Sequence, residues 1–212
     1  MDLFEFIRSI TIVPVIRGAT VDNIIPIGLA LQQGGIPIME ITMETRGALY
    51  ALEKAVLELE EMVVGAGTVI DSETAQRVIE VGAQFIVSPS FSVDVIQIAK
   101  KRKIFSVAGG LTPTEIVAAF QCGADMIKVF PASTFGPKYI QQIKEPLPHI
   151  PLMVTGGINE ETICEYIKAG VDAVGIGNSL VNTRRLLNDR ELQEITRRAL
   201  TLTTITRKGY TL

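Results

Sequence analysis

Short apolar runs alternate with longer amphipathic segments along most of the chain. The runs are apolar at consecutive positions, which is typical of strands buried on both faces of a parallel sheet. Eight such runs are predicted to be strands, at residues 12–17, 37–43, 62–68, 84–89, 104–109, 125–131, 152–157 and 172–177. Segments with helical periodicity follow them, at residues 21–33, 46–60, 72–81, 92–101, 113–121, 137–144, 160–169 and 185–205.

Local signals and the order of the elements together predict the fold. Thr112 and Glu115 have the spacing of a capping box, and Pro113 occupies the first helical position after the cap. Eight parallel strands, each followed by a helix, predict an α/β fold of the closed (β/α)8 type, a TIM barrel, with an open doubly wound sheet as the alternative. The segment MDLFEFIRSI at residues 1–10 is amphipathic, so we expect a short helix that covers one end of the barrel.

Glycines end alternate predicted helices and give a common register. These glycines are Gly35, Gly82, Gly123 and Gly170. Counting five residues onward from each glycine reaches Glu40, Val87, Lys128 and Gly175. Side chains from alternate strands of a barrel form shared interior layers. Glu40 and Lys128 should therefore point inward at similar height from opposite strands, which places a carboxylate and an amine in one cavity.

Composition narrows the functional classes. A chain of 212 residues, 47% of them hydrophobic, can form one α/β domain over residues 1–212. The net charge of −3 gives no general attraction to nucleic acid or to an anionic membrane, and no apolar run is long enough for a signal peptide or a membrane span. The two cysteines, Cys122 and Cys164, are expected to be reduced thiols of a cytosolic protein. The single histidine, His149, lies in a predicted loop, so serine–histidine catalysis and a histidine-rich metal site are not supported.

Lys128 stands in the middle of an apolar predicted strand, between Ile127 and Val129. Burial disfavours the charged ammonium, and a neutral amine can form a Schiff base with a carbonyl carbon. A neighbouring Glu40 carboxylate favours the charged form, and it could also move protons on the adduct. The same two residues could equally form a purely structural ion pair inside the barrel.

Two glycine-rich turns follow the last two predicted strands. Gly156 and Gly157 stand at the end of the first of these strands, and Asn178 and Ser179 follow the second, in the region where the loops of TIM barrels commonly bind a phosphate. Such turns can also simply end strands. Arg17 and Thr68 stand at the ends of the first and third predicted strands, where they could bind a substrate carboxylate, although a threonine there could equally cap a loop.

Several motifs in order along the chain resemble one enzyme family. They are VPVIRG, GGIPIMEITMET, GAGTV, FIVSP, TPTEI, GADMIKVFPASTFGP and TGGI, over about residues 12–180. The sequence resembles the class I aldolases of 2-keto-3-deoxy-6-phosphogluconate (KDPG) and 4-hydroxy-2-oxoglutarate (KHG). The resemblance implies a TIM barrel, usually a cytoplasmic homotrimer, that works without a metal or an organic cofactor.

The resemblance also assigns roles to individual residues. It implies that Lys128 forms the Schiff base and that Glu40 is the general acid and base. It implies that Thr68 contacts pyruvate, that Phe130 lies beside the lysine, and that Pro89 belongs to the site. The phosphate loops of the family correspond to Thr155, Gly156, Gly157 and Ser179.

One position departs from the family pattern. Many members have an arginine where this chain has Glu44, and there the arginine meets the substrate carboxylate. A carboxylate cannot replace that contact, so we expect Arg17 to take it over. This arrangement resembles the related aldolases of 6-phospho-2-dehydro-3-deoxygalactonate (KDPGal).

The sequence therefore predicts a class I aldolase that cleaves a 2-keto-4-hydroxy acid. The expected reactions are cleavage of KDPG to pyruvate and glyceraldehyde 3-phosphate, cleavage of KHG to pyruvate and glyoxylate, or both. KDPGal is the alternative substrate. A sugar-phosphate isomerase or epimerase on the same barrel is a different reaction class, in which Glu40 would be the base and Lys128 only an electrostatic group. A non-catalytic module that binds phosphosugars is a third hypothesis.

Overall fold

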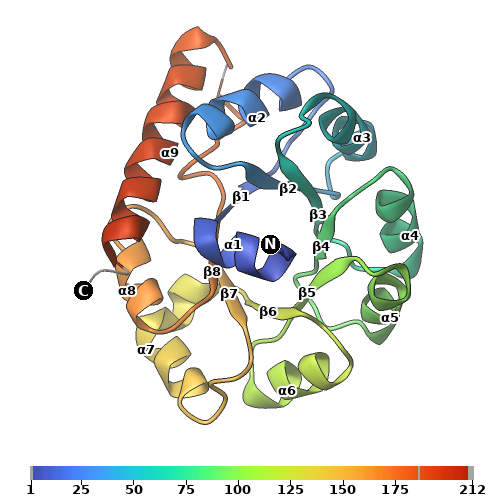
Figure 1. Ribbon diagram of the computed structural model, residues 1–212, viewed down its shortest axis with the longest axis vertical. Helices are drawn as coiled ribbons and strands as arrows, with labels where there is room; N and C mark the ends of the chain where they lie inside the picture. The colour runs from blue at the N-terminus through green and yellow to red at the C-terminus, as the bar shows by residue number, and fades with distance from the viewer. Residues whose placement is uncertain (1, 186, 210–212) are drawn as a thin grey trace.

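The computed structural model describes residues 2–185 and 187–209, and its strands form a closed parallel barrel in the order β1-β2-β3-β4-β5-β6-β7-β8. In Figure 1 the barrel is seen end-on, with helices α2 to α9 around its outside. The strands are β1 Ile12–Ile16, β2 Ile38–Thr42, β3 Val63–Gly67, β4 Phe85–Val87, β5 Phe105–Gly109, β6 Met126–Val129, β7 Leu152–Thr155 and β8 Ala173–Ile176. The helices are α1 Leu3–Ile10, α2 Ile24–Gln33, α3 Ala48–Glu58, α4 Ser72–Glu80, α5 Val93–Arg102, α6 Pro113–Gln121, α7 Ala132–Lys144, α8 Ile163–Lys168 and α9 Asp189–Gly209.

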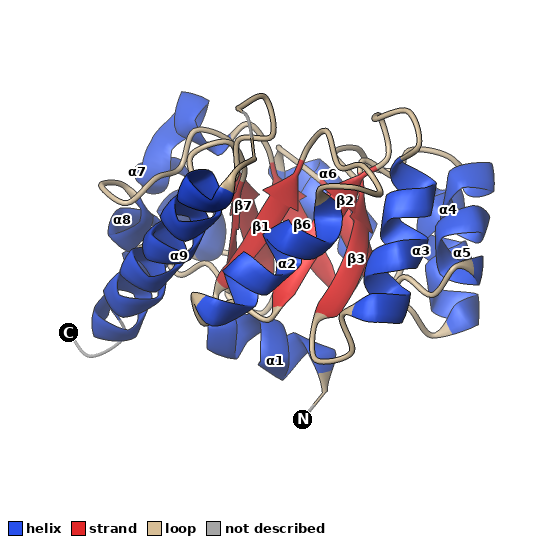
Figure 2. Cartoon of the chain, turned by 90° about the horizontal axis from the view of Figure 1, so that it is seen from above, coloured by secondary structure: helices blue, strands red, loops and turns tan. Residues whose placement is uncertain are grey.

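The predicted TIM barrel is confirmed, and so is the short helix at one end. Helix α1 lies across the end of the barrel from which the strands start (Figures 1 and 2). The carboxylate of Asp2 accepts a hydrogen bond from the Glu5 amide at 2.8 Å, which caps the helix. Ile7 of α1 is fully buried, so the helix seals the apolar interior at this end. Among the described residues, no helix combines the length and apolar character needed to cross a bilayer.

Helix α7 begins earlier than the sequence pattern predicts. The sequence pattern predicts a helix over residues 137–144, but helical structure already starts at Ala132, soon after β6 ends at Val129. Gly136 interrupts it with φ of 76°, and Pro137 begins the second part. The glycine–proline pair therefore marks an internal break in α7 instead of its start. Helix α9 is also shifted, from the predicted residues 185–205 to Asp189–Gly209.

Register determines which side chains fill the barrel. Glu40 pairs with Val15 on β1 and with Gly65 on β3, and parallel partners share a face of the sheet. A Cβ atom at Gly65 would lie 2.5 Å from ring carbons of Phe85, which is almost fully buried on β4. The absence of a side chain at Gly65 thus makes room for the largest interior ring.

This packing predicts that Gly65→Ala destabilises the barrel. The added methyl group would overlap a buried aromatic ring, and overpacking of this kind costs about 1–3 kcal/mol. The free energy of unfolding from urea denaturation should fall by that amount. Gly177→Ala is the control, because a Cβ atom there would have only the Val15 carbonyl oxygen nearby, at 3.9 Å. Equal stability of the two variants would contradict this account of the interior.

Candidate active site

Lys128 and Glu40 meet inside the barrel, as their register predicted. Lys128 projects from β6 and Glu40 from β2, and they are 3% and 0% exposed. The lysine Nζ lies 3.7 Å from Glu40 Oε1. Strands β2 and β6 are on opposite sides of the barrel, so the pair spans its interior.

The Glu40 carboxylate is in an unusual environment. Neither of its oxygens accepts a hydrogen bond from the described part of the chain. Burial is the largest influence and raises the pKa of Glu40, while the positive charges of Lys128 and Arg17 lower it in part. The net effect is a raised pKa, which brings the carboxyl group closer to the range in which it can both accept and release a proton near neutrality.

Phe130 connects this pair with the surface. It follows β6, and the Nζ atom of Lys128 lies 5.8 Å from the centre of its ring. The ring is partly exposed and lines a pocket of about 320 Å³ at the ends of the strands. Lys128 and Glu40 do not line this pocket themselves; they lie beside it, next to Phe130 and to Val15, the strand partner of Glu40.

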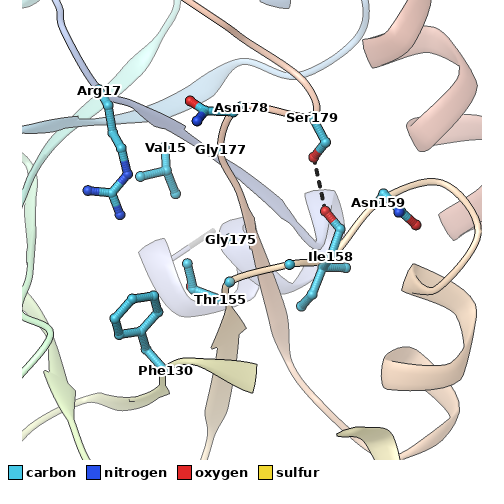
Figure 3. A pocket seen from close by; sticks show the side chains of 12 residues that line it. Val15, Arg17, Phe130, Thr155, Ile158, Asn159, Gly175, Gly177, Asn178 and Ser179 are labelled. Carbon is cyan, nitrogen blue, oxygen red and sulfur yellow. Dashed lines mark hydrogen bonds between the residues drawn. The ribbon is translucent and has the colours of Figure 1, made fainter. Parts of the chain in front are cut away.

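The pocket is formed chiefly by the segments that follow β1, β7 and β8 (Figure 3). Most of the residues predicted for a substrate site are brought together here. The residues that line it are Val15, Arg17, Phe130, Thr155, Gly156, Gly157, Ile158, Asn159, Gly175, Gly177, Asn178 and Ser179.

The loop after β7 exposes its backbone to the pocket. Gly156 and Gly157 have φ of 101° and 74°, a region that side chains other than glycine rarely adopt. A Cβ atom at Gly156 would lie 3.1 Å from the ring of Phe130, a tight contact that glycine avoids. The hydroxyl of Thr155, at the end of β7, is buried and has no hydrogen-bond partner within the described residues.

The loop after β8 makes one helical turn. The amides of Leu180 and Val181 donate to the carbonyl of Gly177 at 2.9 and 3.0 Å, which leaves the amides of Asn178 and Ser179 outside the turn's own hydrogen bonds. The Ser179 hydroxyl donates to the Ile158 carbonyl at 2.9 Å and joins the two loops (Figure 3). Backbone amides at the start of such a turn, beside a glycine loop, suit an anion such as phosphate.

Arg17 approaches the pocket from the end of β1. Its Nη1 atom lies 3.2 Å from Glu44 Oε1, and both side chains are about two-fifths exposed, 43% and 41%. Its loop is fixed on two sides. The Gly18 amide donates to the Thr45 hydroxyl at 3.0 Å, and the Thr183 hydroxyl donates to the Arg17 carbonyl.

Besides Lys128 and Glu40, two further predicted site residues do not line this pocket. Thr68 directly follows β3 and Pro89 lies just after β4, so both are at the same end of the barrel as the pocket. Thr68 has φ of 57°, a strained conformation for a β-branched residue. The carbonyl group of Pro89 packs against Gly109 on β5.

Other lining residues were not predicted as site residues. Val15 and Gly175 share the interior register of Glu40 and Lys128, which is the signal that could have identified them. Asn159 also lines the pocket, and its side-chain oxygen accepts hydrogen bonds from the Glu161 and Thr162 amides. The described residues contain no cluster of three or more histidine, cysteine or acidic side chains that could hold a metal ion.

Comparisons with known proteins agree with this geometry. The family model described as KDPG and KHG aldolase matches residues 3–198. The 2-dehydro-3-deoxy-phosphogluconate aldolase of Treponema pallidum is 32% identical over 166 residues, which are 78% of this chain and 79% of that protein. The 2-dehydro-3-deoxy-6-phosphogalactonate aldolase of Escherichia coli is 30% identical over 174 residues, which are 81% of this chain and 85% of that protein.

A solved structure adds a chemical comparison. The KDPG aldolase of Legionella pneumophila, with pyruvate captured at low pH as a covalent carbinolamine intermediate, has a TM-score of 0.88 and 26% identity to this chain. The match covers 95% of this chain and 98% of that one. The fold, the buried amine beside a carboxylate and the extent of these matches lead to one conclusion. The chain belongs to the family of KDPG and KHG aldolases.

Proposed function

We propose that the protein is a class I aldolase in which Lys128 forms a Schiff base with a 2-keto-4-hydroxy acid. The observation that carries the proposal is the buried Lys128–Glu40 pair, 3.7 Å apart, beside a pocket at the ends of the barrel strands. The carbinolamine in the Legionella relative supports the same chemistry, because a carbinolamine is the first adduct of an amine and a ketone.

The reaction begins at the C2 ketone of the substrate. The neutral Lys128 amine attacks this carbon to form a carbinolamine, and loss of water gives an iminium ion. Glu40, acting through a water molecule, removes the proton from the C4 hydroxyl. The C3–C4 bond then breaks, and its electron pair moves into the iminium, which becomes an enamine. The aldehyde leaves, a proton returns to C3, and hydrolysis releases pyruvate and the free amine.

The two ends of the substrate have separate binding sites in this proposal. Arg17 and Thr68 bind the carboxylate at C1, and Phe130 and Pro89 pack around the reacting carbons. Thr155, Gly156, Gly157, Asn178 and Ser179 receive the phosphate of a phosphorylated substrate. KDPG and KHG are the favoured substrates, and KDPGal is the alternative that the Escherichia coli relative supports.

We also propose that the protein is a cytoplasmic homotrimer, which rests on the family resemblance. Sedimentation equilibrium should then give three times the chain mass of 23.0 kDa. A concentration-independent monomer or dimer would contradict the trimer and would leave the chemistry at Lys128 unaffected.

Lys128→Ala should abolish both turnover and covalent capture of pyruvate. The wild-type protein is incubated with pyruvate and reduced with borohydride, and the adduct is located by peptide mass spectrometry. Lys138→Ala is the control, because Lys138 is an exposed lysine on α7, the helix that follows the same strand. A folded wild-type protein without any adduct would favour the isomerase or the binding module. An adduct on another lysine would remove Lys128 from its proposed role.

Glu40→Gln should lower turnover by about 10²- to 10⁴-fold, the usual contribution of a general acid or base. As a base, Glu40 must be deprotonated, so wild-type activity should fall as the pH drops through its raised pKa. This acidic limb should begin at higher pH than for an ordinary glutamate and should be absent from the variant. The pH profile of kcat/KM measures both effects. Full activity in the variant would reduce Glu40 to a structural partner of Lys128.

A further inference from the structure

The wall of the pocket contains an ion pair that the reaction scheme does not use. Arg17 is the one arginine or lysine among the described residues that line the pocket. Its Nη1 atom lies 3.2 Å from Glu44 Oε1. The cation best placed to receive a substrate carboxylate is therefore already paired with a carboxylate of the protein.

The pair is held in place by its surroundings. Glu44 stands two residues after Thr42, the last residue of β2, and Thr45 beside it accepts a hydrogen bond from the Gly18 amide. The loop that carries Arg17 and the loop that carries Glu44 are thus joined by this backbone-to-side-chain hydrogen bond as well as by the ion pair. The contact uses one guanidinium nitrogen, so the remaining donors of Arg17 can still face the pocket (Figure 3).

Both charges also act on the reaction centre. Burial dominates the raised pKa of Glu40, and among the smaller influences Arg17 lowers this pKa while Glu44 raises it. Opposite effects on one buried carboxyl group indicate that Arg17 and Glu44 are both close enough for a substrate beside Lys128 to feel their fields.

We propose that Glu44 is a specificity-determining residue that offsets the charge of Arg17 and so selects phosphorylated keto acids over short dicarboxylic ones. The inference rests on the proposed function and names the substrate class of the same site. A substrate carboxylate must share Arg17 with Glu44 and is repelled by it. KHG is short and carries carboxylates at both of its ends, so its second carboxylate stays nearer to this pair than a phosphate on C6 would, and it is repelled by Glu44 as well. In KDPG or KDPGal the second anionic group is a phosphate, which the loops after β7 and β8 receive.

Removing the charge of Glu44 tests this assignment. In Glu44→Gln, the pyruvate concentration that gives half-maximal borohydride trapping should fall two- to fivefold, a change typical of a partly exposed ion pair. Maximal trapping should stay the same, because Glu44 does not touch the reacting atoms in this scheme. The kcat/KM for KHG should rise more than that for KDPG or KDPGal, whichever the wild-type protein cleaves.

Two controls separate this effect from a general change of charge. Glu73→Gln removes the charge of another exposed glutamate that pairs with a single arginine, Arg77. It should leave both the half-maximal pyruvate concentration and kcat/KM unchanged. When Arg17 is also replaced by Gln, Glu44→Gln should no longer lower the half-maximal pyruvate concentration, because the interaction between the two side chains requires both of them.

Several results would overturn the assignment. An increase in the half-maximal pyruvate concentration would mean that Glu44 helps by orienting Arg17. If Glu44→Gln lowered the half-maximal pyruvate concentration equally with and without Arg17, the effect would come from the net charge of the protein and not from the Arg17–Glu44 pair. If kcat/KM rose equally for KHG and for the phosphorylated substrate, Glu44 would not determine which of them is preferred. If the wild-type protein traps pyruvate but Glu44→Gln has no effect, only this inference fails, whereas a wild-type protein that traps no pyruvate overturns the Schiff-base proposal as well.

Discussion

Lys128 and Glu40 bring opposite charges into a barrel interior that water barely reaches. Removing an ion from water costs on the order of several kcal/mol, and a buried pair recovers this only when its geometry and additional hydrogen bonds are favourable. Here the two atoms are 3.7 Å apart and the carboxylate has no hydrogen bond within the described chain, so the compensation is incomplete. Closure of the surrounding barrel must supply the stability that holds such a pair in place. The arrangement suits catalysis better than it suits stability. In an ion pair with all of its hydrogen bonds made, the lysine would be held as the charged ammonium, which cannot attack a ketone.

The barrel divides the work between rigid strands and adaptable loops. Strands β2 and β6 hold the two reacting groups in the interior, where their register fixes the height of each side chain. The loops after β7 and β8 offer mainly backbone amides, which can bind an anion without adding another buried charge. The protein groups beside the reacting carbon and those that bind the far end of a substrate can therefore change independently on the same barrel.

The sequence pattern predicts the barrel because buried parallel strands and amphipathic helices leave strong periodic signals. It also predicts that Glu40 and Lys128 meet, since interior position follows from strand register alone. It does not predict the break at Gly136, because a glycine–proline pair is compatible with either the start or an interruption of a helix. Nor does it predict the contact of Arg17 with Glu44, which depends on the path of two loops that are far apart in the sequence.

The positions of α1 and α9 have a practical consequence. Helix α1 covers the end of the barrel where the strands begin, and α9 runs along the outside and ends on the side away from the strand tips (Figure 2). The pocket opens among the loops at those tips. A fusion partner or a surface linker attached beside α1 or beside the end of α9 would therefore lie away from the mouth of the pocket. Immobilisation from that side of the barrel should leave diffusion of small keto acids to the site unhindered.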